Sequence, residues 1–327
     1  MKAFFHQGDE LAVGTINEPD LQDGEVKVKL KVAGINHRDL LITERRGRND
    51  EPLILGSDGA GTIEAVGEGV TAFSVGEEVI VNPGKGWINK SNTAPTGFEV
   101  VGMPNHGTFA EKYVVDAAYL EKKPAYLTWE EAGVLALPAL TGFRAIFTKG
   151  QLRSSDTVFL PGAGSGVATY IIQFAKAIGA RVIVSSRSKE KREKALELGA
   201  DVAIDTSEDW EVALDGETID LVIDSVGEAT FNRSLAILKK GGRMVTFGAT
   251  TDDNVTIDIR KFFYGQYQLF GSTMGSREEL REMLAFIEKY QIHPVVDRIF
   301  PLDDALESFS YLEKAKQFGK VGIRVSN

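Results

Sequence analysis

The chain has 327 residues, which is enough for two domains of ordinary size, and its 43% hydrophobic and 26% charged content is typical of a globular protein. Its formal net charge of −10 argues against a general nucleic-acid-binding surface. The sequence contains no cysteine, which excludes disulfides, thiolate nucleophiles and cysteine metal sites. No apolar run reaches membrane-spanning length and the N-terminus lacks the apolar core of a signal peptide, so we expect a cytoplasmic protein without a membrane segment.

The first part of the chain, to about Lys123, is rich in strand and turn patterns. Glu25–Ala33 alternates strictly between polar and apolar residues, as a half-exposed strand does. Further strands are expected at Gly59–Gly67, Glu78–Asn82 and Phe109–Val115. This pattern predicts an antiparallel, barrel-like domain. The segment Pro83–Gly107 has little periodicity, and a loop of that length is usually functional or forms an interface.

From Thr128 onward helices and strands alternate. Thr128 and Glu131 form a capping-box pattern that predicts a helix through Ala132–Phe147. Strands are then expected at Val158–Leu160, Arg181–Val184, Val202–Ile204, Asp220–Asp224, Arg243–Phe247 and Tyr267–Ser272, with helices at Lys189–Leu198, Ala229–Leu238 and Arg277–Tyr290. Such alternation predicts an α/β fold with a doubly wound parallel sheet. The tail Gly319–Val325 is expected to be a strand that returns to the first domain.

Thr157–Arg187 has the pattern of a strand, a tight glycine turn, a helix and a second strand. The turn contains Gly162, Gly164, Ser165, Gly166 and Val167, and it points backbone N–H groups and a helix N-terminus at an anion. A dinucleotide pyrophosphate is therefore the expected ligand, with a ligand-free tight turn as the alternative. The glycines depart from the usual G-x-G-x-x-G spacing, because the sixth position is Val167.

The end of the second strand indicates which dinucleotide is bound. Rossmann domains that prefer NAD place an acid there to bind the ribose 2′-hydroxyl. Here Ser186 and Arg187 occupy this position and Lys191 follows one turn later. Hydroxyl and cationic groups suit a 2′-phosphate, so the pattern predicts NADP(H). The alternative is a solvated, charge-rich helix start.

The whole chain resembles the medium-chain dehydrogenase/reductase superfamily, between its quinone oxidoreductases and its zinc alcohol dehydrogenases. The segments that carry the resemblance are Gly34–Asn36, Gly56–Gly67, Leu137–Thr141, Gln173–Lys176, Asp224–Gly227 and Gly319–Val321. The resemblance implies a GroES-like β-barrel catalytic domain formed by residues 1–124 and 278–327, and a Rossmann domain formed by residues 125–277. It also implies a nicotinamide cofactor in the cleft between them, a small-molecule substrate, and a homodimer (or dimer of dimers) that pairs the sheet edges near Tyr267–Ser272.

The chain departs from the zinc alcohol dehydrogenases at the positions of their metal ligands. Asn36 stands where they have a cysteine, and Ser57 and Asp58 replace the His-Glu of a Gly-His-Glu motif. The third ligand would fall near Pro138, and the four histidines have no partner at metal spacing. We therefore expect no metal. Without a metal to polarise a carbonyl, the hydride acceptor must already be activated, as a quinone or a conjugated enone is.

The resemblance also implies roles for individual residues. Asn36 would lie beside the nicotinamide and the substrate, or it simply holds a turn; His37 would meet the pyrophosphate, or it is an ordinary surface histidine. Lys320 would reach the cofactor or cap the final strand, and Leu41 stands near the position where quinone oxidoreductases offer a tyrosine. The remaining expected cofactor contacts are Thr141 on the helix that faces the nicotinamide, and the strand-end residues Val226, Gly227, Phe247, Gly248 and Ala249.

These expectations combine into an NADPH-dependent, zinc-independent oxidoreductase acting on a quinone or an activated enone or carbonyl. Two alternatives remain open at this stage. One is an alcohol or aldehyde dehydrogenase of the same superfamily, and the other is a non-enzymatic NADPH-binding protein, because no proton donor is identifiable. The substrate pocket is expected to be shaped by loops such as Thr43–Glu51 and Pro83–Gly107.

Overall fold

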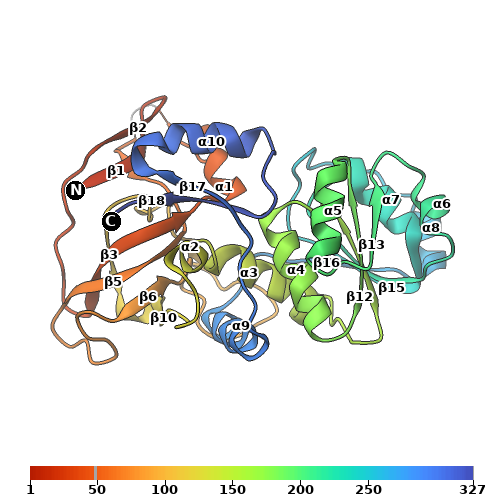
Figure 1. The fold of residues 1–327 in the computed structure, drawn as a ribbon, viewed down its shortest axis with the longest axis horizontal. Helices are drawn as coiled ribbons and strands as arrows, with labels where there is room; N and C mark the ends of the chain where they lie inside the picture. Colours follow the sequence, from red (N-terminus) through yellow and green to blue (C-terminus); the bar gives the residue numbers. More distant parts are fainter. Residues whose placement is uncertain (48–49, 327) are drawn as a thin grey trace. The chain divides into compact units, whose positions relative to one another are not determined.

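Figure 1 shows the protein as a computed structural model, which describes residues 1–47 and 50–326. Arg48 and Asn49, which belong to the predicted loop Thr43–Glu51, and Asn327, the last residue of the predicted catalytic domain, lie outside the described residues. The chain forms two compact units: unit 1 comprises residues 1–138 and 275–327, and unit 2 comprises residues 139–274. The sequence had predicted 125–277 for the central domain, so the first division lies later in the chain than expected.

Unit 2 is built on a six-stranded parallel sheet in the order β13-β12-β11-β14-β15-β16. Its strands are β11 (Thr157–Pro161), β12 (Arg181–Ser186), β13 (Val202–Asp205), β14 (Ile219–Asp224), β15 (Leu238–Thr246) and β16 (Gln268–Gly271). The order runs outward from β11 in both directions, which is the doubly wound arrangement predicted from the alternating helices and strands. β11, β12 and β14 are buried along nearly their whole length, as strands covered on both faces are.

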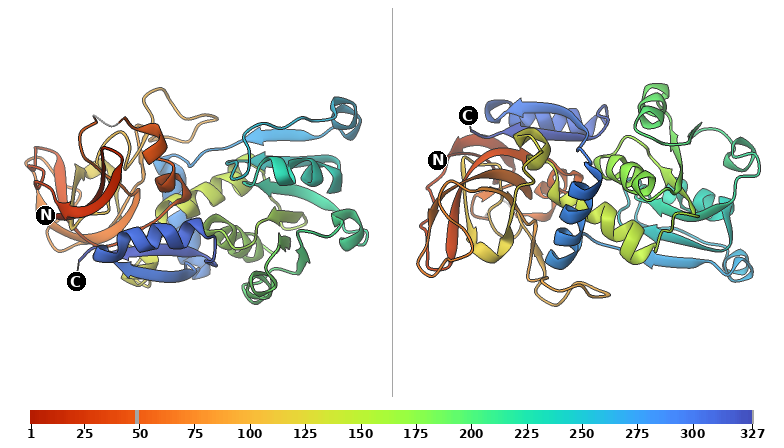
Figure 2. Two further views of the ribbon diagram at one scale, coloured as in Figure 1. Left: turned by 90° about the horizontal axis from the view of Figure 1, so that it is seen from above. Right: turned by 60° about the horizontal axis from the view of Figure 1, so that its bottom comes forward.

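Helices cover both faces of this sheet. They are α4 (Gly166–Ala177), α5 (Lys189–Glu197), α6 (Trp210–Ala213), α7 (Glu228–Ile237) and α8 (Ile259–Gly265). Phe159, Ile183 and Val222 point to one face, where they pack with Trp210 of α6 and Phe231 of α7. Right-handed crossovers place α4 and α5 on the opposite face, and Figure 2 shows the same layers from two further directions.

The prediction of one continuous helix through Ala132–Phe147 is wrong, because the structure has three separate helical segments there. Thr128 caps the start as predicted, because its hydroxyl accepts from the Glu131 N–H and the Glu131 carboxylate accepts from the Thr128 N–H. The helix α2 (Trp129–Gly133) then stops, α3 (Ala136–Phe143) follows, and Arg144–Lys149 continues as a π-helix. Mid-helix changes of pitch carry no clear sequence signal when, as here, the chain is apolar almost throughout.

Unit 1 contains a seven-stranded sheet in the order β10-β6-β5-β3-β18-β17, with β9 also paired to β3. Its strands are β3 (Glu25–Gly34), β5 (Asp58–Val66), β6 (Glu78–Val81), β9 (Lys112–Asp116), β10 (Leu120–Lys122), β17 (Val296–Pro301) and β18 (Lys320–Arg324). Val26, Val28 and Leu30 are fully buried, as the alternation of this strand predicted. The expected antiparallel pairing holds except between β17 and β18, which are parallel.

Smaller elements complete unit 1. A three-stranded sheet contains β1 (Lys2–Gln7), β2 (Glu10–Thr15) and β4 (Leu53–Ile54), and the segment Pro83–Gly107 contains the short pair β7 (Gly84–Lys85) and β8 (Glu99–Val100). The helices are α1 (His37–Leu40), α9 (Arg277–Tyr290) and α10 (Ala305–Glu313), and the 3₁₀ turns are Thr43–Arg45, Ala117–Tyr119 and Leu302–Asp304. In the described part of the chain, no helix is both long and apolar enough to cross a membrane.

The segment Pro83–Gly107 is held by packing and by α9. Trp87 is 2% exposed, its ring packs edge-on against Phe98 at 5.3 Å, and its Nε1 donates to Ser91 Oγ at 2.9 Å. The N–H groups of Arg277 and Glu278 donate to the carbonyls of Trp87 and Ile88. The segment is thus ordered by an aromatic core and by hydrogen bonds to the start of one helix.

Candidate functional site

In unit 1 the candidate site forms where two strands from opposite ends of the sequence meet. β3 and β18 are antiparallel, with Gly34 opposite Gly322. Two residues beyond this pair, the same register places Asn36 across from Lys320. The Ile35 N–H donates to the Val321 carbonyl at 3.0 Å and continues the pairing. Long-range strand register therefore brings Asn36 and Lys320 together.

Asn36 is held between a cation and an anion. Lys320 Nζ donates to Asn36 Oδ1 at 2.7 Å and to the Ile35 carbonyl at 2.5 Å. Asn36 Nδ2 donates to Asp58 Oδ2 at 2.9 Å, and Lys320 Nζ lies 3.9 Å from the same oxygen. The second oxygen of Asp58 accepts from the Leu137 N–H at 2.6 Å. Asn36 is 7% exposed, Lys320 4% and Asp58 0%, so these interactions are shielded from water.

A second carboxylate and an arginine extend this cluster. Asp39 Oδ2 accepts from the Asn36 N–H at 2.8 Å, while its Oδ1 is buried with no hydrogen-bond partner among the described residues. Arg38 Nη1 donates to Ser57 Oγ at 2.7 Å and to the Val101 carbonyl at 3.0 Å, and it lies 3.9 Å from Asp39 Oδ1. Asp39 therefore holds the backbone at Asn36 in place.

Burial shifts the ionisation of each charged group in this cluster. Loss of solvation raises the pKa of Asp39 to about 6, with Arg38 the strongest opposing charge. Loss of solvation likewise raises the pKa of Asp58 and lowers the pKa of Lys320, which the attraction between these two groups partly offsets. Two buried carboxylates, the buried Lys320 and the partly exposed Arg38 lie close together, so the cluster is close to neutral when all four are ionised.

The family's zinc does not fit these side chains. Residue 36 contributes an amide oxygen that already accepts from an ammonium, and residue 57 contributes a hydroxyl that donates to the Val101 carbonyl at 2.7 Å. Zinc prefers thiolate, imidazole and carboxylate ligands, and the Lys320 charge would repel a divalent cation. Across residues 1–47 and 50–326, no group of three His, Cys, Asp or Glu residues could hold a metal ion.

In unit 2 the glycine turn joins β11 to α4. Gly162 has φ +80°, which favours glycine, and the N–H groups of Gly162 and Ala163 both donate to the Ser185 carbonyl. Ser165 caps α4 by accepting from the Ala168 N–H at 3.1 Å. Gly166 and Val167 are the first two helical residues, whose N–H groups have no acceptor within the helix. The helix start that the sequence predicted after the glycine turn is therefore present, with its first N–H groups left without an intrahelical acceptor.

The ends of three neighbouring strands meet beside this turn. A side-chain carbon built on Gly162 would lie 3.6 Å from Val226, which follows β14. One built on Gly227 would lie 3.0 Å from the Cβ of Ala249, which follows β15. The structure therefore groups Gly162 with Val226, Gly227 and Ala249 at the carboxyl edge of the sheet, the usual ligand position in this architecture.

The predicted 2′-phosphate residues lie at the end of β12 and just after it. Lys191 covers the glycine turn, since a carbon built on Gly164 would come within 2.6 Å of its side chain. Ser186 is buried, and its Oγ accepts from the Ser188 N–H at 3.2 Å. Arg187 is exposed and makes no hydrogen bond or ion pair with the residues that the structure describes. Arg187 therefore stands exposed without an internal partner among the described residues, and Lys191 lies over the glycine turn.

The other predicted cofactor residues differ in their surroundings. Thr141 is buried in α3, and His37 is exposed at the first position of α1. Phe247 and Gly248 follow the end of β15; Phe247 is partly buried and Gly248 is exposed. The Lys320 ammonium is turned inward onto Asn36 and Ile35, so its bonds do not support a direct cofactor contact. The sequence did not predict that Asp58 and Lys320 both bind the Asn36 side chain. The one sequence feature that pointed to Lys320 was its place at the start of a strand after Gly319.

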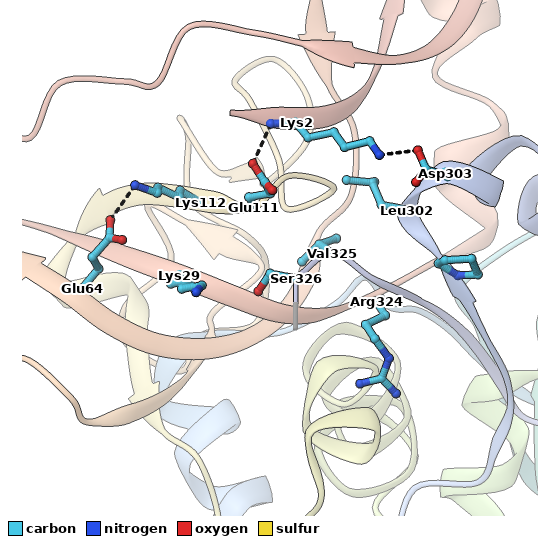
Figure 3. A pocket seen from close by; sticks show the side chains of 11 residues that line it. Lys2, Lys29, Glu64, Glu111, Lys112, Leu302, Asp303, Arg324, Val325 and Ser326 are labelled. Carbon is cyan, nitrogen blue, oxygen red and sulfur yellow. Dashed lines mark hydrogen bonds and ion pairs between the residues drawn. The ribbon is translucent and has the colours of Figure 1, made fainter.

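A cavity described in unit 1 is a different feature. It measures about 510 Å³ and is lined by Lys2, Lys29, Glu64, Glu111, Lys112, Pro301, Leu302, Asp303, Arg324, Val325 and Ser326 (Figure 3). Its charged groups pair with one another, as in Lys112–Glu64 and Lys2–Asp303. None of the predicted site residues lines it, so it is not a candidate for the reaction.

Comparison with known proteins decides the family. Residues 22–125 match the alcohol dehydrogenase GroES-like domain, and residues 166–289 match the zinc-binding dehydrogenase domain. A zinc-type alcohol dehydrogenase-like protein of Schizosaccharomyces pombe is 36% identical over 321 residues, covering 93% of this chain and 92% of the relative. The chain belongs to the medium-chain dehydrogenase/reductase superfamily. An acryloyl-coenzyme A reductase of Sulfurisphaera tokodaii is 30% identical, with 99% of this chain and 100% of the relative covered.

Solved structures of this superfamily share the fold. An NAD-dependent alcohol dehydrogenase has a TM-score of 0.92 with 34% identity and covers 100% of both chains. A 2-octenoyl-CoA carboxylase reductase in complex with NADP and 2-octenoyl-CoA has a TM-score of 0.87 with 26% identity, covering 99% of this chain and 87% of that one. The predicted Rossmann and GroES-like folds and the predicted superfamily are thereby confirmed.

Proposed function

We propose that this dehydrogenase/reductase is an NADPH-dependent, zinc-independent reductase of small molecules that carry a quinone or an alkene conjugated to a carbonyl. The observation that carries the proposal is the arrangement around Asn36. Where a zinc alcohol dehydrogenase has metal ligands, this chain has an amide braced by Lys320 and Asp58.

The nucleotide-binding part of the proposal rests on unit 2. The N–H groups of Gly166 and Val167 and the N-terminus of α4 bind the pyrophosphate, while the strand-end residues around Val226 form the surface for the nucleotide. Arg187 and Lys191 bind the 2′-phosphate. NADPH, when bound, supplies the hydride for the reduction.

The acceptor follows from what the chain offers at the reacting centre. Hydride addition to the β-carbon of an enone moves an electron pair onto the carbonyl oxygen, and that oxyanion needs hydrogen-bond donors. Asn36 Nδ2 carries two hydrogens, of which one is donated to Asp58. The second is the donor that we assign to the substrate oxygen. The α-carbon then takes a proton from water, which completes the two-electron reduction of the alkene.

Two relatives make this substrate class a reasonable choice. The acryloyl-coenzyme A reductase matches the whole chain, and the solved octenoyl-CoA carboxylase reductase binds an enoyl thioester together with NADP. Both act on an alkene conjugated to a carbonyl. Quinones are vinylogous members of the same electronic class, so they remain within the proposal.

An alcohol or aldehyde dehydrogenase is the second candidate function. The NAD-dependent alcohol dehydrogenase of known structure and the zinc-type relative of Schizosaccharomyces pombe favour it. A dehydrogenase that uses a metal requires one bound ion per chain, which elemental analysis of the purified protein measures. A non-enzymatic NADPH-binding protein would consume no NADPH with any acceptor.

We also propose that the protein forms homodimers through β16. Among the residues that the structure describes, this strand pairs only with β15, so its other edge offers backbone groups for pairing. Nearby α8 and β16 expose Ile259, Phe263, Tyr264 and Leu269. Edge pairing of β16 with its copy would cover these apolar side chains.

The proposed function is tested by NADPH consumption with matched acceptors. We expect turnover with quinones or with an enone such as a 2-enoyl thioester, and little with the saturated ketone of the same size. NADH should be a poorer donor, and added chelator should leave the rate unchanged. Preferred oxidation of simple alcohols with NAD⁺ and stoichiometric zinc would overturn the proposal in favour of the alcohol dehydrogenase.

A further inference from the structure

We propose that Lys320 is a positioning residue, an internal cation that fixes the Asn36 amide in one orientation and takes over the place that a metal ion would otherwise have. The inference rests on the proposed function for its kinetic part only. It departs from the cofactor contact that was expected of Lys320.

The position of Lys320 is set by the fold. It is the first residue of β18, and the pairing of β18 with β3 carries its side chain across to Asn36. At 4% exposure the ammonium has little access to water. Its hydrogen bonds to the Ile35 carbonyl and Asn36 Oδ1, and the Asp58 carboxylate at 3.9 Å, stand in for that water.

The amide orientation follows from these charges. An asparagine side chain has nearly the same shape after a half-turn, so packing alone decides poorly between its oxygen and its nitrogen. Here the oxygen faces an ammonium and the nitrogen faces a carboxylate. The flipped amide would point its NH₂ group at the Lys320 ammonium and its oxygen at the Asp58 carboxylate. Both of these contacts are repulsive, so they disfavour the flipped orientation.

One amide hydrogen is left over by this arrangement. Asn36 Nδ2 donates to Asp58 at 2.9 Å, while its contact with the Gly34 carbonyl is long at 3.5 Å. The second hydrogen can therefore be donated to a substrate oxygen at little cost. Withdrawal of electron density from the amide oxygen by Lys320 also makes that N–H a stronger donor, because hydrogen bonds in a chain polarise one another.

The first test replaces Lys320 by methionine, which keeps the length and removes the charge. We expect kcat with an enone or quinone to fall at least tenfold, while the Kd for NADPH stays within twofold. Lys316→Met, at an exposed position nearby in sequence, is the matched control and should change neither value. Weaker NADPH binding with an unchanged kcat would overturn the proposal and return Lys320 to the cofactor.

The second test uses the absence of cysteine from the sequence. In Lys320→Cys the introduced thiol is unique, so it can be alkylated in denaturant and the protein refolded, with wild type taken through the same steps as the refolding control. Bromoethylamine restores an ammonium at nearly the original position, whereas bromoethanol gives a neutral chain of the same length. We expect the aminoethyl form alone to recover kcat, and equal recovery by both forms would refute the role of the charge.

A third measurement does not depend on turnover. In protein labelled with ¹⁵N-asparagine, the Asn36 side-chain NH₂ signals are those missing from Asn36→Ser. We expect slow hydrogen exchange at these signals in wild type and fast exchange in Lys320→Met. Unchanged exchange in Lys320→Met contradicts the positioning role. If wild type reduces no acceptor, the proposed function fails, while this result still decides whether Lys320 fixes the amide.

Discussion

Replacing Arg187 by alanine tests the choice of cofactor. The guanidinium is exposed and has no partner among the described residues, so its removal breaks no internal contact. We therefore expect the free energy of unfolding to change by less than about 0.5 kcal/mol. Any effect on nucleotide affinity then reports on the nucleotide alone.

The size of that effect follows from a hydrogen bond to a charged phosphate. Such a bond contributes about 1.5–3 kcal/mol, so the Kd for NADPH should rise about 10- to 150-fold in Arg187→Ala. NADH lacks the 2′-phosphate, and its Kd should stay within about twofold of the wild-type value. Titration calorimetry with both dinucleotides measures the two changes separately.

Arg181→Ala is the matched control for this experiment. Arg181 lies at the opposite end of β12 and pairs with Glu217 at the surface, where an ion pair contributes at most about 1 kcal/mol to stability. Its removal should leave both nucleotide affinities unchanged. Equal losses for NADPH and NADH in Arg187→Ala, or no loss for either, would refute the assignment of the 2′-phosphate.

Three further predictions concern stability and assembly. Burial raises the pKa of Asp39 from 3.8 to about 6, so the folded state binds the extra proton between these values and stability falls as pH rises through them. Asp39→Asn removes this loss of up to about 3 kcal/mol, and its unfolding free energy relative to wild type should rise from pH 4 to 6 and then level off. Leu269→Lys puts a charge on the free edge of β16 and should give monomers in light scattering. Trp87→Ala should lower the free energy of unfolding in urea by about 3–5 kcal/mol, whereas Ile88→Ala, at a 41% exposed neighbour, should change it by less than about 0.5 kcal/mol.

Each of these three has a result that would contradict it. A constant difference between Asp39→Asn and wild type across the pH range would mean that Asp39 titrates normally. Dimers that survive Leu269→Lys at micromolar concentration would place the interface elsewhere. A Trp87→Ala variant as stable as wild type would mean that the aromatic core does not hold the segment Pro83–Gly107.

Local patterns predicted the nucleotide-binding half well. The strand, glycine turn and helix of Thr157–Arg187 lie within a few residues of β11, α4 and β12. These elements are specified by short-range signals: an unbroken apolar run, glycines at a turn and a periodic apolar stripe. Helix α9 was predicted with the bounds that the structure has, since Ser276 and Glu279 cap its start and Gln291 adopts a left-handed conformation at its end.

Elements that depend on distant partners were predicted poorly. β17 was not foreseen, and it pairs in parallel with β18 across the intervening helix α10. The π-helix at Arg144–Lys149, which begins at a buried arginine, was not predicted either, because no local pattern in this apolar stretch indicates a change of helical pitch. In both cases contacts with distant parts of the chain determine the local conformation, and these contacts outweigh the weak conformational preference of the segment itself.

The contacts of Asn36 with Lys320 and Asp58 could not be predicted from the sequence, because they join residues that are far apart in the chain. Their partner Asn36 lies 284 residues before Lys320, and only the β3–β18 register brings the two side chains into contact. The absence of the zinc dehydrogenases' cysteine and histidine is visible as Asn36 and Ser57, but the cation that we propose takes the metal's place is not. The two changes are nevertheless coupled, because a buried Asp58 needs a positive partner, and an ammonium and a zinc ion cannot both fill that role. Restoring a cysteine at 36 and a histidine at 57 would therefore still leave a cation within 3.9 Å of the Asp58 carboxylate, and metal binding would require the removal of Lys320 as well.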